Sequence, residues 1–431
     1  MTPTSAIETV LARRVWDSRG RPTVEAEIVL ASGAVGRAIA PAGASTGSGE
    51  ALDRRDGGPR LKGRDVQGAI GAVREEIAPA LKGLDARDQA RVDETMIALD
   101  GTPQKSRLGG NALIAVSMAV AHAAAADARL PLWAYLHGDP KGEALLPVPE
   151  IQIFGGGAHA ARALDLQDLM VVPAGAPALE EGFEWVAEVY DAAGELLAKT
   201  RPPMGVADEG GHWPAFESNE DALETLNWAI RTAALSPGRD MFVSVDVAAT
   251  QLWHEGAYRL ASEDRTLATE EFSALLAGWC EAYHILSLED PFREDDAASF
   301  AALQARIGGR VQLIGDDYLV TDVARLKRAV RDKACGAILI KPNQAGTLTE
   351  TKAALDAAKA AGFGTIVSAR SGESEDVTIV HLAVGWGAGQ LKVGSFTRSE
   401  RMAKWNELLR VAEALGERGR WAPQEVFKRW R

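Results

Sequence analysis

The first forty residues show the alternation of apolar and polar positions that is typical of β-strands. From Val24 to Ile28, apolar or small residues alternate with acidic ones, and Ser32 and Gly33 supply a turn before a second run. Side chains of a strand point alternately to its two faces, so this pattern fits a sheet with one buried face. We predict antiparallel strands over residues 1 to about 40.

Residues 66 to 136 change to helical spacing. Apolar residues recur every three or four positions at Ile70, Val73, Ile77 and Leu81. This spacing places them on one face of an α-helix. Strands followed by helices predict an N-terminal domain of the α+β class.

The longest uncharged stretch, from Leu108 to Ala126, is long enough to cross a membrane. It is rich in alanine, whose transfer to lipid gains little free energy, and it contains Asn111, Ser117 and His122. We therefore predict a buried helix of a soluble protein rather than a membrane span.

Short apolar runs recur through the second half of the chain, and each ends on a polar residue. After the first interval, these polar residues follow one another about every 25 residues, the length of one strand, one helix and two short loops. The runs and their polar ends are Phe242–Val245 with Asp246, Ile285–Leu288 with Glu289, Val311–Ile314 with Asp316, Ala337–Ile340 with Lys341, and Thr365–Val367 with Ser368, and Lys392 follows one further interval on.

Parallel strands at this period, with polar residues at their carboxyl ends, indicate a (β/α) barrel, whose active site is built where the strands end. A doubly wound sheet is the alternative, but it normally gathers its polar groups at one switch point after a glycine-rich first turn. Prolines cluster between Pro131 and Pro149, which indicates a domain boundary there. We predict an α/β protein with a capping domain at residues 1–135 and a barrel domain at residues 136–431.

Composition supports a folded chain and restricts its partners. Of the 431 residues, 46% are hydrophobic and 25% charged, which is typical of globular proteins. A net charge of −13 disfavours nucleic acid and anionic membranes as partners. Cys280 and Cys335 form neither a CxxC motif nor a cluster with histidine, so a reducing, cytoplasmic setting fits best. A signal peptide is not expected at this N-terminus.

Asp246, Glu289 and Asp316 end consecutive predicted strands, so a barrel would bring them to one mouth. Three carboxylates cannot remain ionised side by side without a cation, and all-oxygen ligands suit Mg²⁺. The alternative is that each caps the helix that follows its strand. Lys341 ends the next strand, and a lysine near a divalent metal can lose its proton and act as a base. Taken alone, a lysine at this position is more often a surface lysine than a base.

Four loops add polar or flexible positions. The small-residue loop Gly43–Gly47 lacks the GKS/T of a P-loop and alone indicates only a flexible turn. The segments Gly155–His159 and Asp208–Gly211 have the pattern of lids that close over a substrate, although ordinary loops fit as well. The guanidinium and hydroxyl of Arg370–Gly372 could clamp a phosphate or carboxylate, although a surface turn is the alternative.

Together these segments resemble the enolase family over roughly residues 6 to 416. The motifs that carry the resemblance are Asp17–Glu25, Gly43–Gly47, Ala207–Gly211, Leu288–Phe292, Gly315–Asp317, Lys341–Gln344, Arg370–Glu373 and Arg398–Arg401. The resemblance implies a small N-terminal α+β domain, a C-terminal barrel of modified (β/α)₈ type, and a homodimer. It also implies conversion of a phosphorylated hydroxyacid through an ene-diolate, with a lysine base and Mg²⁺.

Residue by residue, the resemblance implies that Asp246, Glu289 and Asp316 bind the first of two Mg²⁺ ions. Ser45 would join the second ion to the phosphate, and Lys341 would remove the proton α to the carboxylate. The remaining implied roles belong to Lys392 at the substrate's carboxylate and hydroxyl end, Arg370 and Ser371 at the phosphate, His159 on a closing loop, Gln167 as a substrate-side amide, Glu209 as the acid that helps hydroxide to leave, and Asp168 as an accompanying acid.

Three positions depart from the enolase pattern. Asp168 stands where enolases have glutamate, Ala369 where they have histidine, and Phe154–Gly155 where they have an aliphatic residue and asparagine. A shorter acid and a missing imidazole would impair the ordinary reaction, because proton-transfer partners must lie within hydrogen-bond reach. The space left at Ala369 would admit a ligand that is bulkier at phosphorus.

These departures lead us to expect a specialised relative acting on a phosphorylated or phosphonylated carboxylate. Such a relative is carboxyphosphonoenolpyruvate synthase, of phosphinothricin-type phosphonate biosynthesis. An enolase that acts on 2-phosphoglycerate is the alternative, and a dehydratase for another phosphorylated or phosphonylated hydroxyacid is a third. A non-catalytic binding protein is disfavoured, because it has no reason to keep a destabilising cluster of like charges.

Overall fold

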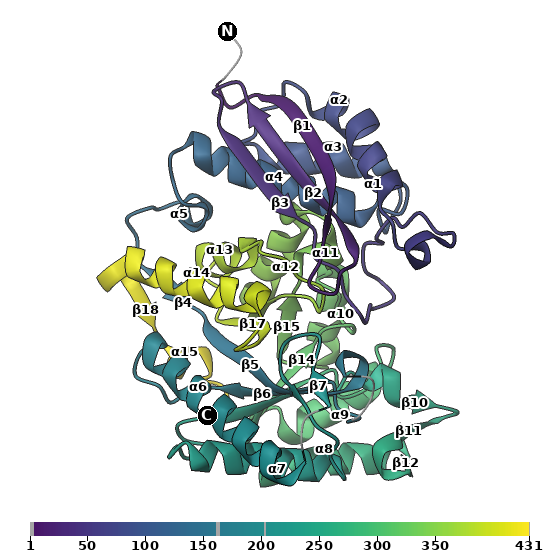
Figure 1. The fold of residues 1–431 in the computed structure, drawn as a ribbon, viewed down its shortest axis with the longest axis vertical. Helices are drawn as coiled ribbons and strands as arrows, with labels where there is room; N and C mark the ends of the chain where they lie inside the picture. Colours follow the sequence, from purple (N-terminus) through teal and green to yellow (C-terminus); the bar gives the residue numbers. More distant parts are fainter. Residues whose placement is uncertain (1–3, 161–163, 202–203, 431) are drawn as a thin grey trace.

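The fold consists of a small sheet with helices at one end of the molecule and a closed barrel at the other (Figure 1). The computed structural model describes residues 4–160, 164–201 and 204–430. The N-terminal sheet is antiparallel, in the order β1 (Ile7–Trp16), β2 (Pro22–Leu30) and β3 (Val35–Ile39). This confirms the strands predicted from the alternation of apolar and polar residues.

Helices cover one face of this sheet, and α4 is the central one. The helices of the N-terminal part are α1 (Gln67–Ala72), α2 (Ala78–Leu81), α3 (Gln89–Asp100), α4 (Gly110–Asp127) and α5 (Leu132–His137), of which α5 packs on α13 (Thr378–Gly385) of the barrel part. A Cβ at Gly36 of β3 would lie 2.1 Å from the backbone nitrogen of Ala123 in α4. Glycine at this position therefore lets the strand and the helix backbone approach closely.

The long apolar stretch forms this core helix. Among the described residues, Gly110–Asp127 is the helix whose length and composition would allow it to cross a membrane. Inside the molecule, 83% of this 18-residue helix is buried. It packs against β2, which supplies Val24, Ala26 and Ile28 to the same core, and against β3, which supplies Ala38. The prediction of a buried helix is confirmed.

Eight strands close into the barrel because β17 pairs with β5 as well as with β16. All neighbouring pairs are parallel except those of β6, which runs antiparallel to both β5 and β9. The closed ring excludes the doubly wound sheet. In ring order the strands are β5 (Val148–Gly155), β6 (Asp168–Val172), β9 (Phe242–Asp246), β13 (Ile285–Glu289), β14 (Gln312–Gly315), β15 (Ala337–Ile340), β16 (Gly364–Ser368) and β17 (Gln390–Ser395).

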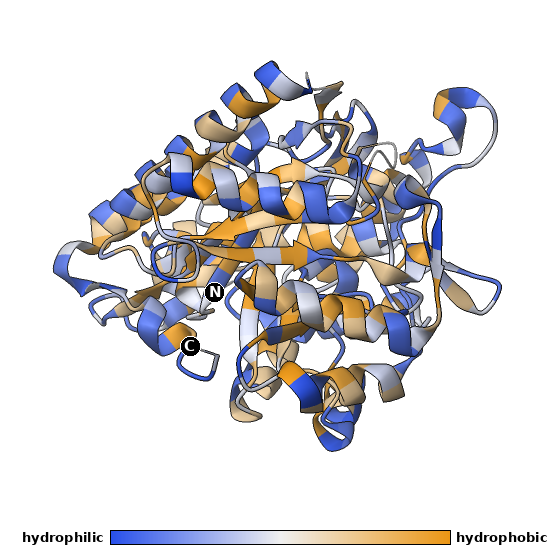
Figure 2. Ribbon diagram, turned by 90° about the horizontal axis from the view of Figure 1, so that it is seen from below, coloured by the Kyte–Doolittle hydropathy of each residue, from blue (hydrophilic) through white to orange (hydrophobic). Residues whose placement is uncertain are grey.

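Helices surround the barrel, and Figure 2 shows largely orange strands inside helices that have blue outward faces. The helices are α6 (Leu179–Thr200), α7 (Asn219–Thr232), α8 (Thr269–Ala282), α9 (Ala297–Ile307), α10 (Val323–Asp332), α11 (Pro342–Ala345), α12 (Leu348–Ala360), α13 (Thr378–Gly385), α14 (Ser399–Leu415) and α15 (Pro423–Val426). Short strands complete the fold: β4 (Ala144–Leu146) with β18 (Gly419–Trp421), β7 (Gly205–Val206) with β8 (His212–Trp213), and β10 (Trp253–His254), β11 (Ala257–Leu260) and β12 (Arg265–Leu267).

The strands predicted from apolar runs are all present, and each ends at or next to its predicted polar residue. The domain boundary placed after residue 135 falls inside α5 and stays a prediction. Both cysteines are free and buried.

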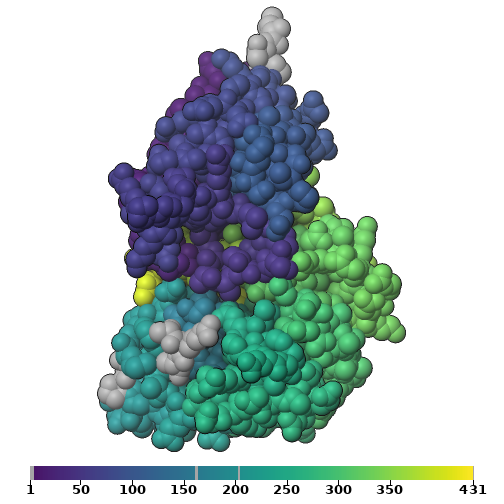
Figure 3. All heavy atoms as spheres, turned by 90° about the vertical axis from the view of Figure 1, so that its right-hand side faces the viewer, coloured from purple at the N-terminus to yellow at the C-terminus, as the bar shows by residue number. Residues whose placement is uncertain are grey.

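The N-terminal part lies over one end of the barrel and contributes to the same site as the strand ends. Figure 3 shows the surface hollowed along the line where the purple and blue N-terminal part meets the teal and green barrel. Two backbone hydrogen bonds, each 2.9 Å long, join Ala42 and Gly372 across this junction. The loop that follows Ala42 is thereby held against the barrel mouth.

Candidate active site

The polar strand ends meet at one mouth of the barrel, as the sequence predicts. Asp246 ends β9 and Glu289 ends β13, and the two residues are register partners on adjacent strands. Asp316 and Lys341 follow the next two strands directly. All four side chains are buried. Helix capping does not account for Glu289 and Asp316, which bond to lysines inside the mouth, whereas Asp246 Oδ1 also accepts the backbone N–H of Ala248 at 3.0 Å.

Two lysines lie among these carboxylates. Lys392 Nζ donates to Glu289 Oε2 at 2.7 Å and to Asp246 Oδ2 at 3.1 Å, and Lys341 Nζ donates to Asp316. Burial disfavours the charged form of Lys341, but Asp316 outweighs burial and raises its pKa. For Lys392, Asp246 and Glu289 raise the pKa well above the ordinary value in the same way. Both amines are therefore held as cations.

The acids at the mouth carry more negative charge than the lysines satisfy. Burial, followed by the charge of Asp246, raises the pKa of Glu289 well above its ordinary value. Glu289 Oε1 is buried and has no hydrogen-bond partner within the described part of the chain. An oxygen donor set with an unsatisfied buried carboxylate oxygen suits a hard cation such as Mg²⁺.

Acidic side chains also approach one another closely beside this set. Oxygens of Asp290, Asp316 and Asp317 lie within 4.8 Å of one another. Asp290 accepts hydrogen bonds from the backbone nitrogens of Asp316 and Asp317, at 2.9 and 2.7 Å. We infer that Asp290 orients the turn that presents Asp316. The sequence analysis did not single out Asp290, although it lies inside a motif quoted there.

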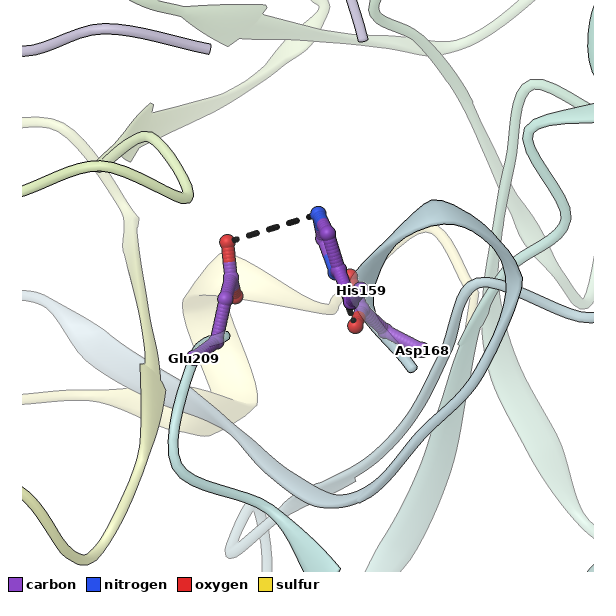
Figure 4. A group of neighbouring side chains, drawn as sticks. All are labelled: His159, Asp168 and Glu209. Carbon is purple, nitrogen blue, oxygen red and sulfur yellow. Dashed lines mark hydrogen bonds and ion pairs between the residues drawn. The ribbon is translucent and has the colours of Figure 1, made fainter. Parts of the chain in front are cut away.

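A second group joins the two loops that were predicted to act as lids. His159 Nδ1 lies 2.9 Å from Asp168 Oδ1, and His159 Nε2 lies 4.0 Å from Glu209 Oε1. Figure 4 shows the imidazole placed between the two carboxyl groups. His159 comes from the segment Gly157–His159, Asp168 begins β6, and Glu209 lies in the loop between β7 and β8.

This geometry shifts the pKa values of Asp168 and Glu209 in opposite directions. Burial opposes ionisation of Asp168, but His159 lowers its pKa to about 2. Burial lowers the pKa of His159, but Asp168 and Glu209 raise it to about 9. Burial, then the charge of Asp168, raises the pKa of Glu209. Asp168 and His159 therefore form an ion pair, and Glu209 is the group better suited to donate a proton.

The His159–Asp168 pair predicts a pH-dependent contribution to stability. A histidine whose pKa rises from 6.5 to about 9 on folding contributes fully below pH 6.5, and its contribution is lost as the pH rises through 9. The contribution amounts to about 3 kcal/mol at most. We expect the difference in free energy of unfolding between the metal-free wild type and a His159→Gln variant to shrink between pH 6.5 and 9.5. Urea unfolding measures it, and a constant difference would contradict the ion pair.

Gln167 and the phosphate-end residues complete the mouth. Gln167 Nε2 donates to Asp246 Oδ2 at 3.0 Å, and Arg370 Nη2 donates to the backbone oxygen of Ser45 at 2.9 Å. Arg19 Nη1 donates to Ser371 Oγ at 3.1 Å, so the N-terminal domain contributes to this end.

One cavity collects most of the predicted site residues. It measures about 20 Å³, and its lining includes Ser45, His159, Gln167, Asp168, Glu209, Asp246, Lys341, Arg370, Ser371 and Lys392. Glu289 and Asp316 do not line it, but they are bonded to Lys392 and Lys341, which do.

Two further buried residues bond to Arg370 or Ser371, and the sequence analysis assigned neither of them a role. Arg401 donates to the backbone oxygens of Arg370 and Ser371, at 2.7 and 2.6 Å, and has no exposed surface. Its motif was quoted for the resemblance, but a charged residue on a helix gives no signal of such burial. Glu50 pairs with Arg370, and nothing in its loop sequence indicated that contact.

A mouth in which buried acids surround two lysines is suited to hold a cation and to move protons, which is the chemistry of a metal-dependent barrel enzyme. The N-terminal domain of enolase matches residues 7–136, and the C-terminal TIM barrel domain of enolase matches residues 143–430. The chain belongs to the enolase family. It is 46% identical over 424 residues to Enolase 1 of Desulfitobacterium hafniense (strain Y51). The aligned region covers 98% of this chain and 97% of that protein.

The expectation of a specialised phosphonate synthase is wrong. A 46% identity along nearly the whole of both chains favours an enolase instead. Ala369 is 6% exposed and lies in the lining of the same cavity as Lys341 and Arg370. The shorter side chain of Asp168 still reaches His159, at 2.9 Å, so this departure does not break the contact between acid and imidazole.

Proposed function

We propose that this protein is an enolase that removes water from 2-phosphoglycerate to give phosphoenolpyruvate. The observation that carries the proposal is the 46% identity over almost the full length of Enolase 1. The enolase family consists of Mg²⁺-dependent lyases, and the buried oxygen donors at this barrel mouth fit such an ion. The substrate is accordingly a small phosphorylated carboxylate.

Mg²⁺ supplies positive charge beside the substrate's carboxylate and phosphate when Asp246, Glu289 and Asp316 bind it. We propose two ions per site, with Ser45 at the second. Lys392 would bind the carboxylate and hydroxyl end of the substrate, where its pKa keeps it charged.

Lys341 is proposed as the base. Its bond to Asp316 holds it protonated in this structure, so it must give up a proton to solvent before it can accept one from the substrate. Loss of that proton would be easier if Asp316 bound a metal ion, because the carboxylate would then no longer stabilise the ammonium group of Lys341. Lys341 then takes the proton from the carbon between the carboxylate and the phosphate ester.

Glu209 is proposed as the acid at the other carbon. Its raised pKa favours the protonated form, which can give a proton to the departing hydroxyl group so that water leaves. The electrons of the broken C–H bond form the new C=C bond. His159 and Asp168 hold the lid next to this acid, Gln167 contributes an amide, and Arg370 with Ser371 holds the phosphate.

Turnover of 2-phosphoglycerate tests the proposal. We expect the purified protein with Mg²⁺ to form phosphoenolpyruvate at about 1 to 1,000 per second, the usual range for enzymes. The ultraviolet absorbance of the new conjugated double bond follows the reaction, and a chelator should stop it. Turnover a thousandfold below this range would contradict an enolase. The proposed homodimer and cytoplasmic setting are tested separately, by sedimentation and by fractionation.

A further inference from the structure

Glu50 forms a buried bidentate ion pair with Arg370. Arg370 Nη1 donates to Glu50 Oε2 at 2.9 Å, and Arg370 Nη2 donates to Glu50 Oε1 at 3.2 Å. The Glu50 and Arg370 side chains are 4% and 3% exposed. Bidentate pairs of this kind fix the plane of a guanidinium group as well as its position.

The same carboxylate also holds the loop that carries Ser45. Glu50 Oε1 accepts the backbone N–H of Gly47 at 3.0 Å and the side-chain amide of Gln344 at 3.4 Å. Gln344 Nε2 donates in turn to Asp316 Oδ1 at 2.9 Å. Glu50 is thus in contact with the metal loop, the guanidinium of Arg370 and, through one amide, a carboxylate of the proposed metal site.

The surroundings leave Arg370 little freedom to adopt another position. A Cβ on Gly43 would lie 2.1 Å from Arg370 Nη2, so the loop packs directly against the guanidinium. Asn343 Oδ1 accepts from Nη1 at 3.0 Å. Burial opposes the charge on Arg370, but Glu50 holds its pKa above the ordinary value, so the guanidinium remains charged.

We propose that Glu50 is a positioning residue that fixes the guanidinium of Arg370 for the substrate phosphate and locks the Ser45 loop over the site. This inference rests on the proposed function, because it takes Arg370 as the phosphate ligand. Glu50 itself does not contact the substrate. It acts by orienting Arg370 and by holding the N–H of Gly47, so the guanidinium and the Ser45 loop depend on one carboxylate.

Glu50→Gln keeps the size of the side chain and removes its charge. With 2-phosphoglycerate and excess Mg²⁺, we expect kcat/KM to fall at least tenfold, with the larger part of the loss in KM, because the phosphate is held before and during the reaction. The rise in melting temperature caused by inorganic phosphate with Mg²⁺ should fall by more than half. The rise caused by Mg²⁺ alone should remain.

Glu294→Gln is the matched control. Glu294 Oε2 accepts the backbone N–H of Ser48 at 2.9 Å, so it also holds this loop, but it has no bond to Arg370. If Glu50 acts through Arg370, Glu294→Gln should keep KM and the phosphate shift close to wild type. Equal losses in the two variants would overturn the proposal, since loop anchoring alone would then explain both.

Other results also decide the question. An unchanged or lower KM in Glu50→Gln would overturn the proposal, because Glu50 would then be idle or would compete with the phosphate.

If Glu50→Gln does not fold, Glu50→Asp is the second variant. It keeps the charge but holds it one methylene short of Arg370, and the same losses are expected. Absence of turnover in the wild type would refute the proposed function, whereas the phosphate shift still tests Glu50. Absence of that shift in the wild type would overturn its role.

Discussion

Replacement of Lys341 by alanine should lower the turnover of 2-phosphoglycerate by about a hundredfold to ten-thousandfold, the range typical of a lost general base. Lys341 Nζ is the amine that follows β15 at the barrel mouth, and it lines the cavity with Glu209 and Lys392. The variant removes a proton acceptor and none of the three proposed metal ligands. Steady-state kinetics with excess Mg²⁺ measure the loss.

Exchange of the substrate's α-proton with solvent deuterium isolates the step assigned to Lys341. Exchange should stop in Lys341→Ala, while the rise in melting temperature caused by Mg²⁺ remains. Lys105→Ala is the control, because Lys105 is also a largely buried lysine, paired with Glu350 at 2.8 Å. Normal exchange in Lys341→Ala would show that another group is the base.

The barrel strands could be predicted because they are buried on both faces. Such strands appear in sequence as continuous apolar runs, and a run like Ala337–Ile340 has only one polar neighbour at its carboxyl end. Position at the end of a strand then brings Asp246, Glu289 and Lys341 to one mouth without knowledge of any long-range contact. Local pattern therefore predicts the carboxylates and the lysine at the mouth, whereas the roles of the loop residues, such as Ser45 and His159, came only from the resemblance to enolases.

Contacts between distant segments could not be predicted in this way. Glu50 and Arg370 are 320 residues apart in sequence, and nothing local to either one indicates that they form a pair. The reversed direction of β6 is equally non-local, because it depends on pairing with β5 and β9. Ala369 was misleading because a single departure from the family pattern says less about the reaction than 46% identity along nearly the whole chain.

Asp316→Asn should abolish the stabilisation that Mg²⁺ gives the folded protein, and turnover with it. A ligand that binds only the folded state stabilises it by about 2.7 kcal/mol at a hundred times its dissociation constant. Replacing a charged oxygen ligand by an amide removes the strongest attraction to the ion. Asp316 is also the partner of Lys341, so the variant's melting temperature without metal changes as well. The informative quantity is therefore the shift on adding Mg²⁺, measured by calorimetry.

Asp332→Asn distinguishes the loss of a ligand from the loss of a carboxylate in general. Asp332 lies at the end of α10, where it pairs with the neighbouring Arg331 at 2.8 Å on the surface. Its replacement removes the same charge from the chain but none from the barrel mouth, so the full Mg²⁺ shift is expected. A full shift in Asp316→Asn would instead place the ion elsewhere. Asp316 also accepts a hydrogen bond from Gln344. A full Mg²⁺ shift in Asp316→Asn would therefore mean that this carboxylate orients its neighbours and does not bind the metal.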